Sequence, residues 1–244
     1  MSTNDGPSSG CLQNSSAPFT LTVLSWTGPE KGLLRVWDVR RRALTGLRVR
    51  MQSPSLAFSP DGRLLAAAVP DPGFQVRDAR SGRIVARLPT DDLERSVAFA
   101  PDGALLATGQ YDGTVQLWST DSWRPVGPPL EGHEGRVLSL DFSPDGHTLA
   151  SSSEDGTLLL RNVDTQKPVG SALTVDADTF VSAAFTPDGS RLFAVSADDR
   201  AVRFEASAGA WKRHACLIAG RDLTTREWSD ALPNRPYRTV CRLR

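Results

Sequence analysis

A pentapeptide that recurs at a nearly fixed interval constrains the fold of this chain more than any single residue. Each copy reads Phe, a small residue and then Pro-Asp-Gly, and the four copies are Phe58–Gly62, Phe99–Gly103, Phe142–Gly146 and Phe185–Gly189. Their phenylalanines lie 41, 43 and 43 residues apart. A period of this size indicates one repeated supersecondary unit, with each unit burying its apolar face against the next.

Each copy is predicted to form a tight turn between two antiparallel strands. Proline presets φ at the second turn position, aspartate is tolerated at the third, and glycine accepts the left-handed conformation that follows. Before the third copy, Leu138, Leu140 and Phe142 alternate with polar residues, which is typical of a strand with one buried face. A second turn, Asp112-Gly113 in one unit and Asp155-Gly156 in the next, marks another hairpin. Each unit therefore holds at least three strands, and with a fourth in the links it is one propeller blade.

These residues resemble the WD40 repeat family. The dipeptide that names the family stands once intact, as Trp37-Asp38, and its first position recurs every 40 to 43 residues. The residues at that position are Trp37, Arg77, Trp118, Arg161 and Phe204. The resemblance assigns these residues to repeat positions: Trp37, Asp38, Asp71, Asp112, Trp118, His133, Ser153, Asp155 and Asp198.

In that family a histidine, a serine or threonine, an aspartate and the tryptophan form a hydrogen-bonded tetrad that stiffens the blade. One unit of this chain comes close, with His133, Ser153 and Asp155 and with Arg161 in place of tryptophan. A hydroxyl, an imidazole and a carboxylate are also the groups of a catalytic triad. Because the repeat already explains their spacing, we interpret these residues as structural and assign no catalytic residue.

The resemblance implies an all-β fold, a WD40-type β-propeller, with residues 19–207 as the repeats. These residues suffice for about 4–5 blades at the observed period, which is incomplete relative to the seven that the family most often has. An unclosed ring leaves sheet edges exposed. The ring is therefore expected to close tightly, to associate with itself through its open edges, or to be a fragment.

The remaining parts of the chain differ in composition. Residues 1–18 are rich in Ser, Gly, Asn and Pro, which predicts a disordered leader and no signal peptide. Residues 208–244 show helical periodicity, and Thr224 stands three residues before Glu227, as in a capping box. We therefore predict a small C-terminal α-helical cap. This tail resembles the cap of large bacterial (actinobacterial-type) WD40 proteins that carry a STAND-type NTPase, protease or kinase domain upstream.

Charge and cysteine content limit the classes of function. The 28 basic and 28 acidic residues balance, so no overall charge favours nucleic acid or an anionic membrane. The sequence contains no run of 18 apolar residues, so we predict no membrane span. We expect the cytoplasm as the compartment. Cys216 and Cys241 either form a disulfide or stay free thiols, as a reducing compartment favours. No Cys and His pairs have the spacing of zinc ligands, so neither a metal nor a cofactor is expected.

The function that the resemblance implies is a non-catalytic protein–protein interaction scaffold or sensor with protein partners. Repeat proteins present broad rigid surfaces to such partners, although a fold by itself does not prove a function. Two alternatives stay open. The chain is a truncated C-terminal remnant of a larger bacterial signalling protein without independent activity, or it is a propeller enzyme.

Overall fold

The structure of this protein is a computed structural model. It describes residues 33–38, 42–50, 55–68, 73–89, 96–174, 180–197, 200–206 and 224. In this part of the chain every regular element is a β-strand, and all strand pairs are antiparallel. The all-β prediction is therefore confirmed for the described residues.

The strands fall into five sheets, which we number along the chain. The first sheet contains β1 (Leu33–Asp38) and β2 (Ala43–Arg50). The second contains β3 (Leu56–Phe58), β4 (Leu64–Ala68), β5 (Phe74–Asp78) and β6 (Ile84–Leu88). The third contains β7 (Ser96–Phe99), β8 (Leu105–Gly109) and β9 (Val115–Ser119). The fourth contains β10 (Val137–Phe142), β11 (Thr148–Ser153), β12 (Thr157–Asn162) and β13 (Leu173–Thr174). The fifth contains β14 (Phe180–Phe185), β15 (Arg191–Ser196) and β16 (Ala201–Glu205).

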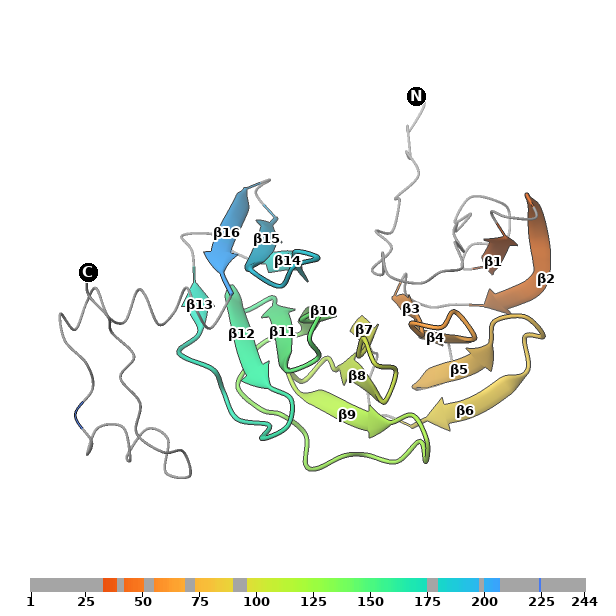
Figure 1. Cartoon of the computed structure of the whole chain (residues 1–244), viewed down its shortest axis with the longest axis horizontal. Helices are drawn as coiled ribbons and strands as arrows, with labels where there is room; N and C mark the ends of the chain where they lie inside the picture. The colour runs from red at the N-terminus through yellow and green to blue at the C-terminus, as the bar shows by residue number, and fades with distance from the viewer. Residues whose placement is uncertain are drawn as a thin grey trace.

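The sheets follow one another around an arc (Figure 1). Within each sheet the strands keep their sequence order, so neighbours are joined by hairpins or short links. The first strands of successive sheets lie beside one another: β7 contacts both β3 and β10, and β10 contacts β14. This is the layered order that the 43-residue period predicts, with one sheet per repeat. The number of blades in the whole chain stays a prediction.

The recurring pentapeptide forms the turn that its residues predict. In the first copy the N–H of Gly62 donates to the carbonyl of Ser59 over 2.8 Å, and Gly62 has a φ of 69°. The Ser59 hydroxyl donates to Asp61 over 2.6 Å and accepts from the N–H of Leu64 over 2.9 Å. The serine hydroxyl and the aspartate carboxylate thus supply hydrogen bonds in the turn that its backbone groups do not form with one another. The same side-chain bonds recur at Ser143 and Asp145.

The hydrophobic core consists of layers between neighbouring sheets. One layer joins the second and third sheets and includes Phe74, Phe99 and Trp118. The next joins the third and fourth sheets and includes Leu117 and Phe142. A further layer joins the fourth and fifth sheets through residues such as Leu158 and Leu192. Each layer takes its side chains from two repeats, so a single repeat has no core of its own.

Polar groups also connect the inner strands of adjacent sheets. The Ser96 hydroxyl on β7 donates to the carbonyl of Val137 over 3.2 Å. On β10, a carboxylate oxygen of Asp141 accepts from the N–H of Phe185 on β14 over 2.7 Å. Burial raises the pKa of Asp141 to about 6, because the ionised carboxylate loses hydration that its hydrogen bonds only partly replace.

Several predictions from the sequence concern residues outside the described ranges. They are the leader 1–18, the helical cap 208–244 apart from Thr224, the repeat aspartates Asp71 and Asp198, and the cysteines Cys216 and Cys241. For Trp37 and Asp38 the structure describes the backbone, which lies in β1. Among the described residues there is no helix long and apolar enough to span a membrane.

Phe142 tests the layered core. Its side chain is 6% exposed between the third and fourth sheets. We expect Phe142→Ala to lower the free energy of unfolding by about 3–5 kcal/mol, because it leaves a cavity between two sheets. Urea denaturation measures the loss. Phe193→Ala is the matched control, since Phe193 is 43% exposed, and an equal loss in both variants would contradict this packing.

Asp141 predicts a pH-dependent difference in stability. Between pH 3.8 and about 6 the folded state holds a proton that the unfolded state has released, so the stability contributed by this group falls as the pH rises. Asp141→Asn keeps an acceptor for Phe185 and carries no charge. The variant should therefore be more stable than the parent by about 3 kcal/mol above pH 6, since one pKa unit corresponds to about 1.4 kcal/mol. Near pH 4 this difference should vanish, and a difference independent of pH would refute the assignment.

Candidate functional site

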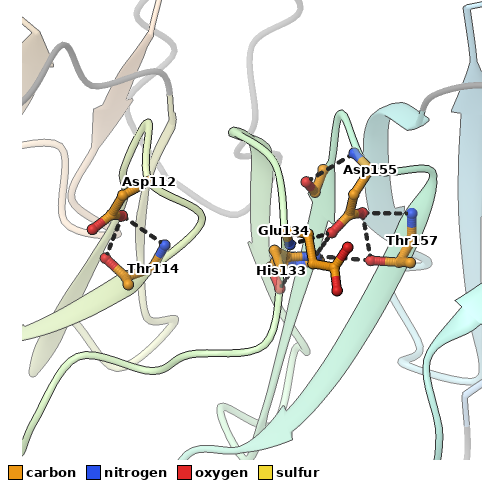
Figure 2. A network of polar contacts seen from close by, with 8 residues as sticks. Asp112, Thr114, His133, Glu134, Asp155 and Thr157 are labelled. Carbon is orange, nitrogen blue, oxygen red and sulfur yellow. Dashed lines mark hydrogen bonds and ion pairs between the residues drawn. The ribbon is translucent and has the colours of Figure 1, made fainter.

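Four of the sequence-predicted repeat residues, Asp112, His133, Ser153 and Asp155, gather where the third and fourth sheets meet. Trp37 and Asp38 lie in β1 of the first sheet, and Trp118 packs in the layer between the second and third sheets. The meeting point of the third and fourth sheets lies at the strand ends opposite the Pro-Asp-Gly turns, because strands β8 and β11 carry the chain across from those turns. Three segments meet there: the turn between β8 and β9, the turn between β11 and β12, and the loop that enters β10 (Figure 2).

The two turns have the same aspartate geometry. Asp112 accepts from the N–H of Thr114 over 2.9 Å and from its hydroxyl over 2.7 Å. Asp155 accepts from the N–H of Thr157 over 2.8 Å and from its hydroxyl over 2.6 Å. Figure 2 shows these two pairs side by side in neighbouring sheets. Each aspartate therefore closes its hairpin by local side-chain bonds.

His133 extends the second turn into a network. Its Nδ1 lies 2.9 Å from the Thr157 hydroxyl and 3.3 Å from Asp155 Oδ2, and its Nε2 lies 2.8 Å from the Ser151 hydroxyl. The same Oδ2 accepts from the N–H of Glu134 over 2.8 Å. The loop that enters β10 is thereby fixed to β11 and to the β11–β12 turn.

The donors in this network assign the histidine tautomer. The Thr157 hydroxyl donates to Asp155, so its oxygen accepts from Nδ1–H of His133, and Nε2 is left to accept from Ser151. Burial lowers the pKa of His133 despite the nearby Asp155 carboxylate, so the neutral ring is favoured. Burial alone would raise the pKa of Asp155, but the bonds from Thr157 and Glu134 outweigh it and the pKa lies below its usual value.

The hydroxyl that contacts the imidazole belongs to Ser151 and not to Ser153, which the repeat pattern had indicated. Both residues lie on β11 two positions apart, so they face the same side of the sheet. Ser153 stands at the end of the strand, where its hydroxyl accepts from the N–H of Asp155 over 3.2 Å. The imidazole reaches the residue one step further into the strand.

The third sheet holds the complementary part of the expected tetrad. Trp118 Nε1 donates to the Thr108 hydroxyl over 3.0 Å. Thr108 precedes Ser151 by 43 residues, and Trp118 precedes Arg161 by the same interval. Ser151 is therefore the counterpart of Thr108 in the next repeat. This equivalence can be recognised only once the hydrogen bond between Thr108 and Trp118 is known. One blade has the tryptophan and hydroxyl, and the next has the hydroxyl, histidine and aspartate.

The order Asp155–His133–Ser151 matches the chemical types of a catalytic triad, but its setting does not suit nucleophilic attack. Ser151 is 2% exposed, so its hydroxyl cannot reach a substrate carbonyl. The described residues also contain no group of three or more His, Cys, Asp or Glu that could hold a metal ion. The geometry supports a structural role for these residues, and the absence of enzymatic activity stays a prediction.

Three side chains at the surface of this junction form what we call the Tyr111–Arg136–Glu154 edge. Arg136 Nε donates to Glu154 over 2.6 Å, and its guanidinium lies 4.5 Å from the centre of the Tyr111 ring. Tyr111 and Glu154 occupy equivalent positions in the two turns, 43 residues apart. Tyr111 is 44% exposed. The edge is therefore an accessible aromatic and charged surface that spans two sheets.

Comparison with known proteins agrees with the repeat assignment. Residues 89–119 and 124–162 match the family model described as WD domain, G-beta repeat. These two segments include Asp112, Trp118, His133, Ser153 and Asp155. A search of curated proteins finds no match to the chain. The match supports assignment of these two repeats to a WD40 family, whereas the upstream domains and the helical cap stay predictions.

The two turn aspartates predict a graded loss of stability. Asp155→Ala removes the acceptor for Thr157, His133 and Glu134 at once. We expect this variant to lose about 2–4 kcal/mol in chemical denaturation, because bonds to a partly buried charge are strong and their donors are left unpaired. Asp112→Ala is the matched control, which removes bonds to Thr114 only and should cost under about 1 kcal/mol. Equal losses would contradict a network centred on His133.

Proposed function

We propose that this chain, two segments of which match WD40 repeats, is a non-catalytic interaction module that binds a protein partner through the Tyr111–Arg136–Glu154 edge. WD40 repeats suggest a protein-interaction module, and the edge is where the described surface has the residue types that interfaces favour. Tyrosine and arginine are enriched among residues that dominate binding energy. The observation that carries the proposal is the exposed Tyr111 ring with Arg136 stacked on it.

The rigidity of the edge supports this assignment. The N–H of Glu154 donates to the carbonyl of Arg136 over 3.0 Å, so the two residues are joined by their backbones as well as their side chains. Below them, Asp155 accepts from the N–H of Glu134 over 2.8 Å. A partner therefore meets side chains that are already ordered, and ordering them on binding costs little entropy.

The charges of the edge indicate the chemistry of its partner. Arg136 is paired with Glu154, so the edge has no strong net charge. The Tyr111 ring and hydroxyl remain accessible. We therefore propose a partner that covers the ring with an apolar side chain and meets the ion pair at its rim with polar groups. Such a partner is a folded protein or peptide in the cytoplasm.

Self-association is a second candidate, favoured by a different observation. On β15 of the fifth sheet the side chains of Phe193 and Val195 are 43% and 44% exposed. Adjacent exposed apolar residues on a sheet face favour association when another surface can cover them. Light scattering over a range of concentrations distinguishes this candidate, since a partner-binding monomer keeps one mass and an associating chain does not.

Affinity capture with matched baits tests the proposed edge. The baits are the parent chain, the double variant Tyr111→Ser with Arg136→Ala, and the control Arg63→Ala. Arg63 lies at the opposite turns with a side chain that is 83% exposed. We expect a protein retained by the parent and the control but lost by the double variant. Its purified form should bind the double variant at least about tenfold more weakly, which corresponds to about 1.4 kcal/mol.

The same experiment separates the rival functions. Unchanged capture by the double variant would place the docking surface elsewhere. Capture of nothing by any bait, together with a native denaturation profile for each, would favour a remnant without independent activity. Labelling of Ser151 by a fluorophosphonate, lost in Ser151→Ala, would support the enzyme alternative.

A further inference from the structure

Arg161 is a buried cation that has no partner among the described residues. Its side chain belongs to β12, and the residue is 7% exposed. Its Nε is buried and makes no hydrogen bond. Burying a charge without a partner is costly because its hydration is lost and nothing replaces it. An anion bound to an arginine in this state would compensate the charge.

Arg77 shows the same position with the two amino groups hydrogen-bonded, although its Nε, like that of Arg161, is buried without a partner. It occupies the equivalent position in the second sheet, with one amino group donating to the carbonyl of Gly82 over 2.8 Å and the other to Gln75 Oε1 over 2.6 Å. Gln75 stands two residues before Arg77, and the residue two before Arg161 is Leu159. In the third sheet the corresponding pair is Gln116 and Trp118, which needs no anion. The fourth sheet alone combines an arginine with an apolar residue at these two positions among the second, third and fourth sheets.

Arg161 lines a pocket of about 230 Å³, and one of its amino groups lies next to Gly132, another lining residue. The pocket lies between the loop that precedes β10 and the segment that joins β12 to β13. Its walls are apolar at Leu159, Pro168 and Ala172, and Gly132 forms part of its rim. A Cβ on Gly132 would lie 2.9 Å from an amino group of Arg161 and 3.2 Å from Leu159 Cδ1. Glycine at this position therefore keeps the cation and the apolar wall in place beside the space.

Two charged residues, Arg161 and Glu131, line the pocket. Burial lowers the pKa of Arg161, but the guanidinium stays protonated at neutral pH because the usual pKa of arginine lies far above neutrality. Glu131 also lines the pocket and is exposed to solvent. None of the ion pairs among the described residues includes Glu131 or Arg161. The positive charge is thus available to a group that enters from outside.

We propose that the Arg161 pocket binds the carboxylate of a small aliphatic acid. The guanidinium presents parallel N–H groups that match the two oxygens of a carboxylate. The apolar walls accept the aliphatic part of the ligand. Because a water occupies about 30 Å³ and pockets for drug-sized ligands start near about 300 Å³, this pocket suits a ligand of a few carbon atoms.

Two sources supply such a group. One is a free short-chain carboxylic acid, and the other is the C-terminal carboxylate of a polypeptide that ends in an apolar residue. Both present a carboxylate next to an apolar group. The pocket shares no residue with the Tyr111–Arg136–Glu154 edge, so this inference does not rest on the proposed protein interaction.

NMR titration of the whole chain tests the site at constant ionic strength. The probes are isobutyrate, with isobutyramide as the uncharged control, and N-acetyl-Ala-Leu with a free or an amidated C-terminus. We expect saturable shifts of the Gly132 amide and of the Arg161 Nε–H with a carboxylate and none with the matching amide. Binding by isobutyrate supports a free acid, and binding by the free peptide alone supports a polypeptide terminus.

Variants keep the test specific. Arg161→Leu should abolish the shifts, and Leu159→Gln should weaken binding at least about tenfold, because the new amide oxygen takes the role that Gln75 has for Arg77. Arg63→Ala removes an arginine side chain that is 83% exposed and should leave binding unchanged. Equal shifts with acid and amide, no shift with any carboxylate, or full binding by folded Leu159→Gln would overturn the proposal. The last variant stays informative if Arg161→Leu does not fold.

Discussion

Burial of each sheet against its neighbour is the constraint on which the rest of the structure depends. Every apolar layer takes its side chains from two repeats, as Phe142 does between the third and fourth sheets. Three or four short strands cannot bury a core alone, so each sheet is stable only as part of the row. The polar bonds between inner strands, such as that of Asp141 with Phe185, then fix how one sheet is placed on the next.

The repeated elements were predictable from the sequence because their chemistry is local. A Pro-Asp-Gly turn needs only its own residues, and the bonds of Ser59 and Asp61 confirm that the pattern predicts the hairpin. The candidate site was less predictable. Ser151 and Ser153 are equivalent by alternation, and which of them meets His133 depends on how the loop before β10 enters the sheet. The Tyr111–Arg136 contact joins two repeats through side chains, which spacing within one repeat does not reveal.

The equivalent positions also show how a repeat protein diversifies. The position held by Trp118 in one sheet is held by arginine in the sheets on both sides, and each arginine is accommodated differently. Where glutamine stands two residues earlier, both amino groups of the guanidinium are hydrogen-bonded inside the blade. Where Leu159 stands there, the charge faces a pocket. In both sheets the pairing with the preceding strand is regular at this position, β4 with β5 and β11 with β12, so this part of the scaffold accommodates either arrangement.

The fifth sheet differs from the third and fourth sheets in having exposed side chains along one face of β15. Along β15 the side chains alternate between exposed and buried, whereas in β8 nearly every residue is buried. A sheet that is covered on one side loses fewer contacts when it opens, and local opening needs less free energy where burial is low. Amide hydrogens of β15 and β16 should therefore exchange with solvent through fluctuations that leave the middle of the row intact. The rate of amide hydrogen exchange would then vary along the arc, with protection greatest in the third and fourth sheets.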